Sequence, residues 1–220
     1  MQFTSAHLRQ ILGAIAEEIE RQKDHLSALD RELGDGDHGV TMSIGWQAVM
    51  KALRDVPETA DCAAICQTVG MAFLNAVGSS VGPLYATAFL RAGAAVKGVD
   101  PLSAQDLLNF WTAFVGGIIE RGKAKVGEKT MVDTWQPALD ALRKAYEEGK
   151  DVAECFRLAA AAGKEGMLAT ASMVSAKGRS SRLGNRSVGH QDPGATSAYI
   201  ILSTFSDQLQ NLFGPQGGIG

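Results

Sequence analysis

Apolar side chains recur at helical spacing through nearly the whole of this 220-residue chain. Eight segments show this pattern, at about residues 8–26, 41–53, 65–77, 83–95, 103–118, 132–146, 151–176 and 192–212. Local signals support several helix starts, because Ser103 and Asp106 have capping-box spacing and Asp192 precedes Pro193 as an N-cap precedes the first helical residue. No stretch alternates apolar and polar residues as a half-buried strand does. The sequence therefore predicts an all-α chain.

The segments are joined mostly by short connections, which favours an antiparallel up-and-down barrel or bundle of eight helices. The 45% hydrophobic content is sufficient for one core at this length, so we expect a single domain over residues 1–213. Residues 214–220, GPQGGIG, are expected to form a disordered tail. In this topology the odd-numbered loops meet at one end of the bundle and the even-numbered loops meet at the other.

Composition argues against several classes of protein. The formal net charge is -3, and the basic residues form no stripe along which nucleic acid could bind. No apolar run reaches the ~20 residues of a membrane span, and the first residues, MQFTSAHLRQ, lack the layout of a signal peptide. Cys62, Cys66 and Cys155 contain no CxxC pair and are expected to be reduced core thiols. We therefore expect a cytoplasmic protein without nucleic-acid or membrane partners.

The two sets of loops differ in composition. Loops 2, 4 and 6 (RDVPET, KGVDPL and EEGKD) are typical solvated connections. Loops 1, 3, 5 and 7 contain glycine-rich turns, clustered acids, hydroxyls and basic residues; they read DRELGDGDHG, VGSSVGP, ERGKAKVGEKT and AKGRSSRLGNRSVGHQDPG. Binding residues concentrate on loops that a rigid scaffold supports. One end of the bundle is therefore predicted to bind a ligand.

Loop 1 contains three closely spaced acids, Asp30, Asp35 and Asp37. Carboxylates at this spacing repel one another unless a cation lies among them, and an all-oxygen ligand set favours Mg²⁺ or Ca²⁺. An EF-hand fits poorly, because Gly39 occupies a position where that loop needs an acid or amide. The alternative is a solvated acidic turn with helix-capping aspartates.

The remaining odd-numbered loops favour a phosphate ligand beside the metal. GSSVG offers backbone N–H groups at the start of a helix, although a glycine-serine turn is often only a turn. Loops 5 and 7 add basic residues, which alone would indicate a solvated face: Arg121, Lys123, Lys125, Lys129, Lys177, Arg179, Arg182 and Arg186. The chain contains neither a P-loop nor a Rossmann fingerprint. Trp46, Trp111 and Trp135 could stack on adenine, but their helical spacing favours core packing.

Three stretches, LDRELGDGDHG, RGKAKVGEKTMVDTW and GRSSRLGNRSVGHQDPGATS, resemble the nucleotide-binding L subunit of bacterial dihydroxyacetone kinases and the C-terminal domain of single-chain dihydroxyacetone kinases. The resemblance runs in order over about residues 8–212. It implies an eight-helix barrel that binds ADP or ATP at one end. It further implies that Asp30, Asp35 and Asp37 ligate two Mg²⁺ ions that bridge the phosphates.

The same resemblance implies a set of nucleotide contacts and a catalytic arginine. Arg179 pairs with phosphate and stabilises the charge of the moving phosphoryl group. The other implied nucleotide contacts are His38, Gly39, Thr41, Ser79, Ser80, Gly122, Met131, Asp192, Pro193 and Gly194. The third loop departs from the family pattern, because it reads GSSVGPL where relatives commonly read close to GGASGPL. This puts a side-chain role for Ser80 in doubt and leaves a different short ketose, such as a tetrulose, as an alternative acceptor.

The resemblance also implies partners. A separate K subunit holds dihydroxyacetone covalently through a histidine, and this chain supplies the phosphoryl group in trans. The donor is either exchangeable ATP or bound ADP that a phosphotransferase-system M subunit rephosphorylates; a homodimer is a further expectation. The alternatives from other classes are a non-catalytic nucleotide sensor that docks on a regulator and a Ca²⁺-binding helical module.

Overall fold

The computed structural model describes residues 1–214, which form nine α-helices and two 3-10 segments. The α-helices are α1 (Ser5–Arg21), α2 (Lys23–Leu33), α3 (His38–Leu53), α4 (Cys62–Ala76), α5 (Val81–Ala95), α6 (Ala104–Gly122), α7 (Val132–Glu147), α8 (Val152–Ala169) and α9 (Pro193–Phe213). The 3-10 segments are η1 (Thr170–Ser172) and η2 (Arg179–Ser187). The β pairing within residues 1–214 is limited to one isolated bridge between Phe3 and Leu102. The predicted all-α class is confirmed.

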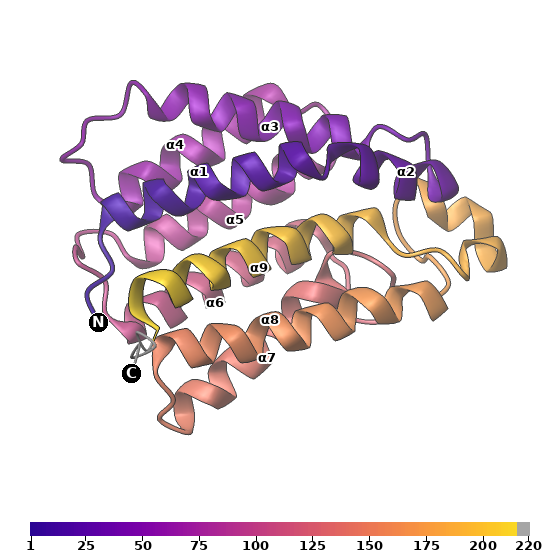
Figure 1. The fold of residues 1–220 in the computed structure, drawn as a ribbon. Helices are drawn as coiled ribbons and strands as arrows, with labels where there is room; N and C mark the ends of the chain where they lie inside the picture. The colour runs from indigo at the N-terminus through magenta and orange to yellow at the C-terminus, as the bar shows by residue number, and fades with distance from the viewer. Residues whose placement is uncertain (215–220) are drawn as a thin grey trace, which may run out of the picture.

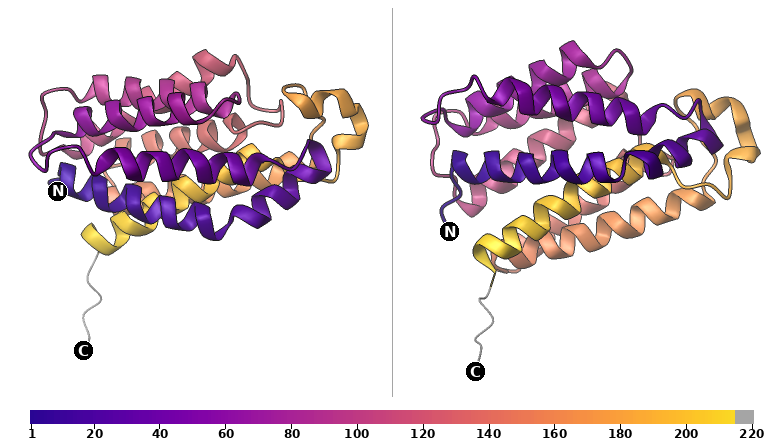
Figure 2. Two further views of the ribbon diagram at one scale, coloured as in Figure 1. Left: turned by 90° about the horizontal axis from the view of Figure 1, so that it is seen from above. Right: turned by 45° about the horizontal axis from the view of Figure 1, so that its top comes forward.

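The helices pack side by side in a closed ring (Figure 1). Each helix from α3 to α9 contacts the next one, and α1 closes the ring because it contacts both α9 and α3. Helices α1 and α2 follow one another and share one position in the ring, as the further views in Figure 2 show. The ring therefore has eight positions, and the predicted up-and-down barrel is confirmed.

Three expected boundaries differ from the observed ones. The first segment is not continuous, because Gln22 (φ -94°, ψ 3°) ends α1 and begins α2. Helix α2 then extends to Leu33, beyond the expected end near residue 26, and carries Asp30 in its last turns. The segment expected over 151–176 leaves the α-helical conformation after Ala169. Of the expected tail, only Gly214, the C-cap of α9, lies within the described residues.

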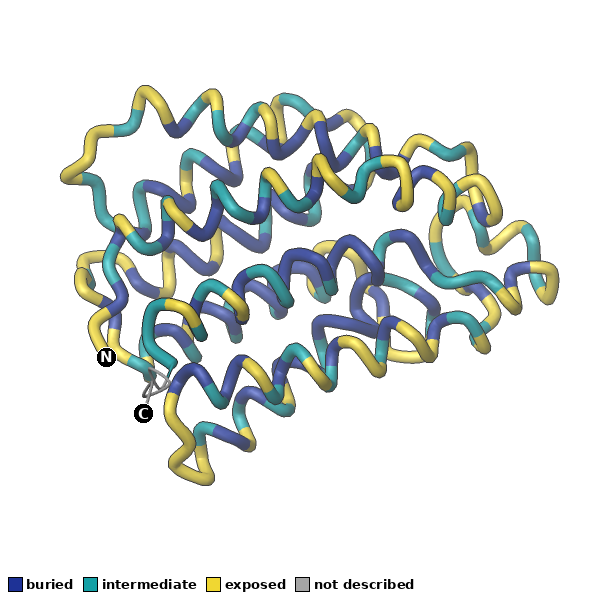
Figure 3. Tube along the Cα trace, in the orientation of Figure 1, coloured by how far each residue is buried: buried dark blue, intermediate teal, exposed yellow. Residues whose placement is uncertain are grey.

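Buried positions, dark blue in Figure 3, lie toward the inside of the barrel, and many of these residues are aromatic. The ring centroid of Trp111 lies 4.9 Å from that of Phe205 and 5.4 Å from that of Trp135. Trp46, Trp111 and Trp135 are 1%, 5% and 1% exposed. These residues belong to the core, as predicted, so none of the three is available to stack on a ligand. The core links α6, α7 and α9 and fixes the loops at their ends.

Different segments of the chain lie at the two ends of the barrel. The described termini lie at one end in Figure 1, whereas α2 and η2 lie at the other. At the end that carries the termini, Arg9 joins α1 to the end of α3 and the loop that follows it. Its guanidinium donates to the carbonyl oxygens of Leu53 (3.2 Å), Val56 (3.2 Å) and Pro57 (2.6 Å). Among residues 1–214, no helix combines the length and apolar character that crossing a membrane requires.

Candidate functional site

A cavity of about 750 Å³ opens at the end of the barrel that carries α2 and η2. All four odd-numbered loops contribute to its wall, from Asp30 in the first to Gly194 in the last. Among the described residues, those of loops 2, 4 and 6 take no part in it. The alternation of up and down helices brings these distant loops together, as the topology predicts.

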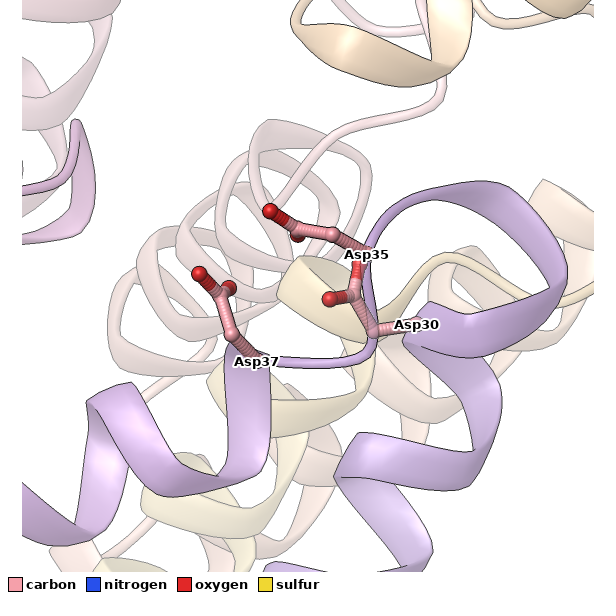
Figure 4. Close-up of side chains that lie close together, drawn as sticks. All are labelled: Asp30, Asp35 and Asp37. Atoms are coloured by element: carbon pink, nitrogen blue, oxygen red, sulfur yellow. The ribbon is translucent and has the colours of Figure 1, made fainter.

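Three carboxylates converge at the mouth of this cavity (Figure 4). Asp30 belongs to α2, Asp35 to the following turn, and Asp37 is the N-cap of α3. One oxygen from each lies within 4.8 Å of the others. Asp37 makes no side-chain cap hydrogen bond within the described chain, so its oxygens remain available to another partner. This donor set fits a hard divalent cation such as Mg²⁺ or Ca²⁺.

A positive charge from loop 7 faces these acids. The guanidinium of Arg179 contacts the Asp35 carboxylate, and its Nη1 lies 3.7 Å from Oδ2 of Asp37. All three side chains are more than half exposed, so these ion pairs contribute little to stability. These contacts occur where η2 lies across the mouth of the cavity.

The start of α5 forms another part of the wall. Ser80 is the N-cap of this helix and makes no side-chain cap hydrogen bond within residues 1–214. The hydroxyl oxygen of Ser79 is buried and has no hydrogen-bond partner in the described structure. A buried hydroxyl without a partner is costly, so this position favours a ligand acceptor or donor. The helix N-terminus beside it favours an anion.

The deeper wall is apolar. Leu84, Ile118 and Met131 line it. Gly122 also borders the cavity, and a Cβ added there would lie only 3.1 Å from Cδ2 of Leu84. The cavity thus combines an apolar wall with a charged mouth. This combination suits a ligand with a flat ring system at one end and anionic groups at the other.

Two buried titratable side chains form the floor between α3 and α9. Nε2 of the His38 ring forms a hydrogen bond with the Ser197 hydroxyl, 2.9 Å away. Burial lowers the pKa of His38 to about 4. Asp192 caps α9 by accepting from the Ala195 N–H at 2.7 Å. Burial raises the pKa of Asp192 to about 7, with smaller contributions from nearby acids. His38 is therefore neutral near pH 7, and Asp192 titrates there.

The predicted site residues lie at this cavity with one exception. Thr41, Pro193 and the residues described above border it. Gly39 does not, because it lies where α3 approaches α2, and a Cβ at this position would collide with the Lys23 carbonyl oxygen. Gly39 is required for this close helix contact. Of the eight basic residues in loops 5 and 7, four border the cavity: Arg121, Lys129, Lys177 and Arg179.

Sequence reasoning missed the role of two residues beside the cavity. Lys129 was expected to supply positive charge, yet it is 1% exposed and its ammonium donates to three backbone carbonyls between Met173 and His190. Asp133 is buried and accepts from the N–H groups of Gly127 (2.5 Å) and Thr130 (2.7 Å). The Thr130-to-Asp133 spacing is a capping signal that could have identified Asp133. Nothing local in the sequence marks Lys129.

The chain is similar in sequence to known proteins. The chain is 38% identical over 181 residues to the ADP-binding subunit DhaL of a PEP-dependent dihydroxyacetone kinase from Escherichia coli (strain K12), covering 82% of this chain and 86% of that one. It is 40% identical over 193 residues to the ADP-binding subunit DhaL of a PTS-dependent dihydroxyacetone kinase from Lactococcus lactis subsp. lactis (strain IL1403), covering 88% and 92%.

The fold is also similar to that of a solved structure. The dihydroxyacetone kinase from C. freundii in complex with AMP-PNP and Mg²⁺ superposes with a TM-score of 0.72 at 22% sequence identity, over 94% of this chain and 34% of that one. This likeness concerns the fold alone. The model of the DAK2 domain matches residues 32–207, which include the aspartate turn from Asp35 onward, Arg179 and the start of α9. The chain therefore belongs to the DAK2 domain family.

Proposed function

We propose that this chain is the nucleotide-binding subunit of a dihydroxyacetone-type kinase and works in the cytoplasm. It transfers a phosphoryl group from a magnesium nucleotide to a short ketose held on a separate K subunit. The observation that carries the proposal is the cavity in which three converging carboxylates face Arg179 beside an apolar wall. The similar chains named as ADP-binding subunits of dihydroxyacetone kinases support it.

The cavity suggests a role for each group of residues. Asp30, Asp35 and Asp37 would hold two Mg²⁺ ions, and these ions would neutralise phosphate charge when bound. Arg179 stabilises charge on the phosphoryl group in transit. The start of α5, with Ser79 and Ser80, offers hydroxyl and backbone donors to phosphate.

The remaining cavity residues orient the nucleotide. Gly122 and Met131 border the place for the base or ribose, and Thr41 offers a hydroxyl near the phosphates. His38 and the residues from Asp192 to Gly194 form the floor. Because the His38 ring is bound to Ser197 and neutral, it supports this floor rather than acting as a general base.

The acceptor is expected on another protein. The nearby His190 lies 3.7 Å from Glu32 through Nδ1 and is not among the cavity residues. Exposed apolar side chains occur on loops and helix ends near the cavity, including Val126, Leu168, Val174 and Val188. These features favour a docked K subunit that presents the ketose to an outward-facing terminal phosphate and excludes water. This chain itself would act as a monomer or a homodimer.

The donor could be exchangeable ATP or bound ADP that an M subunit rephosphorylates. The names of the similar chains, PEP-dependent and PTS-dependent, favour the second route. Mass spectrometry of nucleotide released from freshly purified, denatured protein tests this. Stoichiometric ADP is expected for rephosphorylation in place, whereas a preparation without nucleotide that takes up ATP supports exchange.

Reconstitution tests the activity as a whole. This chain alone should not phosphorylate dihydroxyacetone, and activity should appear when the K subunit is added with ATP or a phosphorylated M subunit. Parallel assays with a tetrulose determine the acceptor. Rapid phosphorylation by this chain alone would disprove the division of labour, and absence of activity in every reconstitution would disprove the kinase function.

A further inference from the structure

Lys129 is a buried cation at the edge of the cavity. Its side chain is 1% exposed, although lysine is almost never fully buried without a partner. Nζ donates to the carbonyl oxygens of Met173 (3.2 Å), Ser187 (2.5 Å) and His190 (2.5 Å). An ammonium has three N–H donors, so all three are used. Within residues 1–214 this ammonium forms no ion pair with a carboxylate.

The three carbonyls lie at the two ends of one segment. Met173 begins the segment 173–190, and Ser187 and His190 end it, so a single ammonium joins both ends at the base. Three further hydrogen bonds support this base. They join Ser175 N to Ser187 Oγ (2.9 Å), Gly189 N to Ala171 O (2.7 Å) and Ala176 N to Glu128 O (3.1 Å).

The segment with this base carries Arg179 to the metal-binding acids. Its outer part, η2, is largely exposed and reaches the aspartate turn through the contacts of Arg179 with Asp35 and Asp37. Exposed ion pairs of this kind contribute too little to fix such a segment. Lys177 adds another exposed ion pair, with Glu128 (3.8 Å), and η2 touches α2. The buried base differs from these contacts because it holds both ends of the segment.

Lysine has the chemistry that this position requires. Three carbonyls that converge in a buried space need a donor for each oxygen, because an unsatisfied buried acceptor is costly. Methionine has a side chain of similar length and offers no donor. Burial lowers the pKa of the Lys129 ammonium, and nearby Asp192 opposes this shift.

We propose that Lys129 is a positioning residue whose ammonium holds the base of the segment 173–190 and thereby places Arg179 opposite Asp35 and Asp37. The consequence for phosphoryl transfer rests on the proposed kinase function; the consequence for the segment does not. Because Lys129 also borders the cavity, direct contact with a phosphate is the competing explanation.

Trypsin provides a direct test, since the segment contains four cleavage sites: Lys177, Arg179, Arg182 and Arg186. In Lys129→Met, cleavage between residues 177 and 186 should accelerate at least about tenfold, because local opening no longer breaks the three hydrogen bonds. Lys164→Met is the matched control, since it removes an exposed lysine from α8 and should leave cleavage in the segment unchanged. Wild-type cleavage of Lys129→Met would overturn the proposal.

The reconstituted kinase assay separates positioning from phosphate contact. In Lys129→Met, kcat should fall at least about tenfold while the Kd for Mg-ADP changes less than about threefold, because Arg179 acts mainly as charge moves. A loss of Mg-ADP affinity that matches the loss of rate would overturn the proposal in favour of phosphate contact. If the wild type shows no kinase activity, the proposed function fails, while the trypsin comparison still decides the role of Lys129.

A second variant covers the case in which Lys129→Met does not fold. Lys129→Gln keeps two N–H donors on a shorter side chain. Its cleavage rate in the segment should exceed that of the wild type, with circular dichroism that shows the helices intact. A cleavage rate equal to that of the wild type would overturn the proposal.

Discussion

Helices that start at opposite ends of the barrel begin in different ways. At the end away from the cavity, the N-cap side chain of each helix accepts a hydrogen bond from a first-turn N–H: Thr4 from His7 (3.4 Å), Asp61 from Ala64 (2.8 Å), Ser103 from Asp106 (3.2 Å) and Asp151 from Glu154 (2.8 Å). At the cavity end, the N-cap residues of α3, α5 and α7 make no such bond within the described chain; they are Asp37, Ser80 and Met131. The first-turn N–H groups of His38 and Val132 donate instead to side chains outside the N-cap position, Asp30 (3.2 Å) and Thr130 (3.1 Å). The N-cap side chain itself therefore caps the helix only at the far end, apart from α9.

Helix α9 is the exception at the cavity end. Asp192 caps it, but this carboxylate is buried and its pKa is raised to about 7. The far-end caps Asp61 and Asp151 are not buried. Burial therefore disfavours the charged form of the capping aspartate at the cavity end. The capping aspartates at the far end are not subject to this cost of full burial.

The largest contrast between the two ends is expected in metal-dependent nucleotide binding. In the double variant Asp35→Asn, Asp37→Asn, the affinity for Mg-ADP should fall at least about 100-fold, or ~2.7 kcal/mol, because two charged ligands are lost. Asp55→Asn removes an exposed acid from the far-end loop and serves as the control. Isothermal titration calorimetry measures all three proteins. Unchanged affinity in the double variant would show that the cavity-end aspartates only shape the turn.

The next contrast concerns the pH dependence of stability. The folded pKa of Asp192 is about 7, and an aspartate in an unfolded chain titrates near ~3.9. Between these values the folded state holds the extra proton, so this contribution to stability is present at low pH and lost as pH rises through about 7. In Asp192→Asn this group no longer titrates.

Urea unfolding of both proteins between about pH 5 and 7 measures the effect. The free energy of unfolding of the wild type minus that of Asp192→Asn should decrease with rising pH, by at most ~1.4 kcal/mol per unit. His38, whose lowered pKa acts in the opposite sense, is present in both proteins and cancels. A difference that stays constant or increases would contradict the buried environment of Asp192.

The smallest contrast is between capped and uncapped helix starts. Asp151→Ala should lower the free energy of unfolding by ~1 kcal/mol, because it removes the bond to the Glu154 N–H, and should leave Mg-ADP affinity unchanged. Ser80→Ala removes no cap bond and should cost at most a few tenths of a kcal/mol. Thermal unfolding compares both with the wild type. Equal losses of unfolding free energy in the two variants would show that the N-caps at the two ends do not differ in their contribution to stability.

Local signals account for what the sequence predicted well. The capping box at Ser103 and the Asp192–Pro193 start are both found where expected. The number of helices and their up-and-down order were enough to predict that the odd-numbered loops meet at one end. The location of the cavity could therefore be predicted without knowing where any side chain lies. By contrast, Gln22 interrupts a helical pattern without the glycine or proline that marks a break, so the division between α1 and α2 was missed.

Lys129 shows what sequence alone does not provide. Its three acceptors are backbone carbonyls more than forty positions further along the chain, and every residue type could present them equally. Lysine in a loop favours exposure, and only the folded arrangement makes it a core residue. Gly39 is similar, because its need for close helix contact depends on where α2 lies.

The position of α9 has a consequence for how the protein is made. Asp192, Pro193 and Gly194 complete the cavity wall, and Phe205 further along the same helix packs against Trp111 and Phe156. The ribosome synthesises α9 after all the other parts of the site. A nascent chain can therefore display its aspartate turn long before it can enclose a ligand. Ligand capture would then require that α9 has been synthesised and has packed onto the barrel.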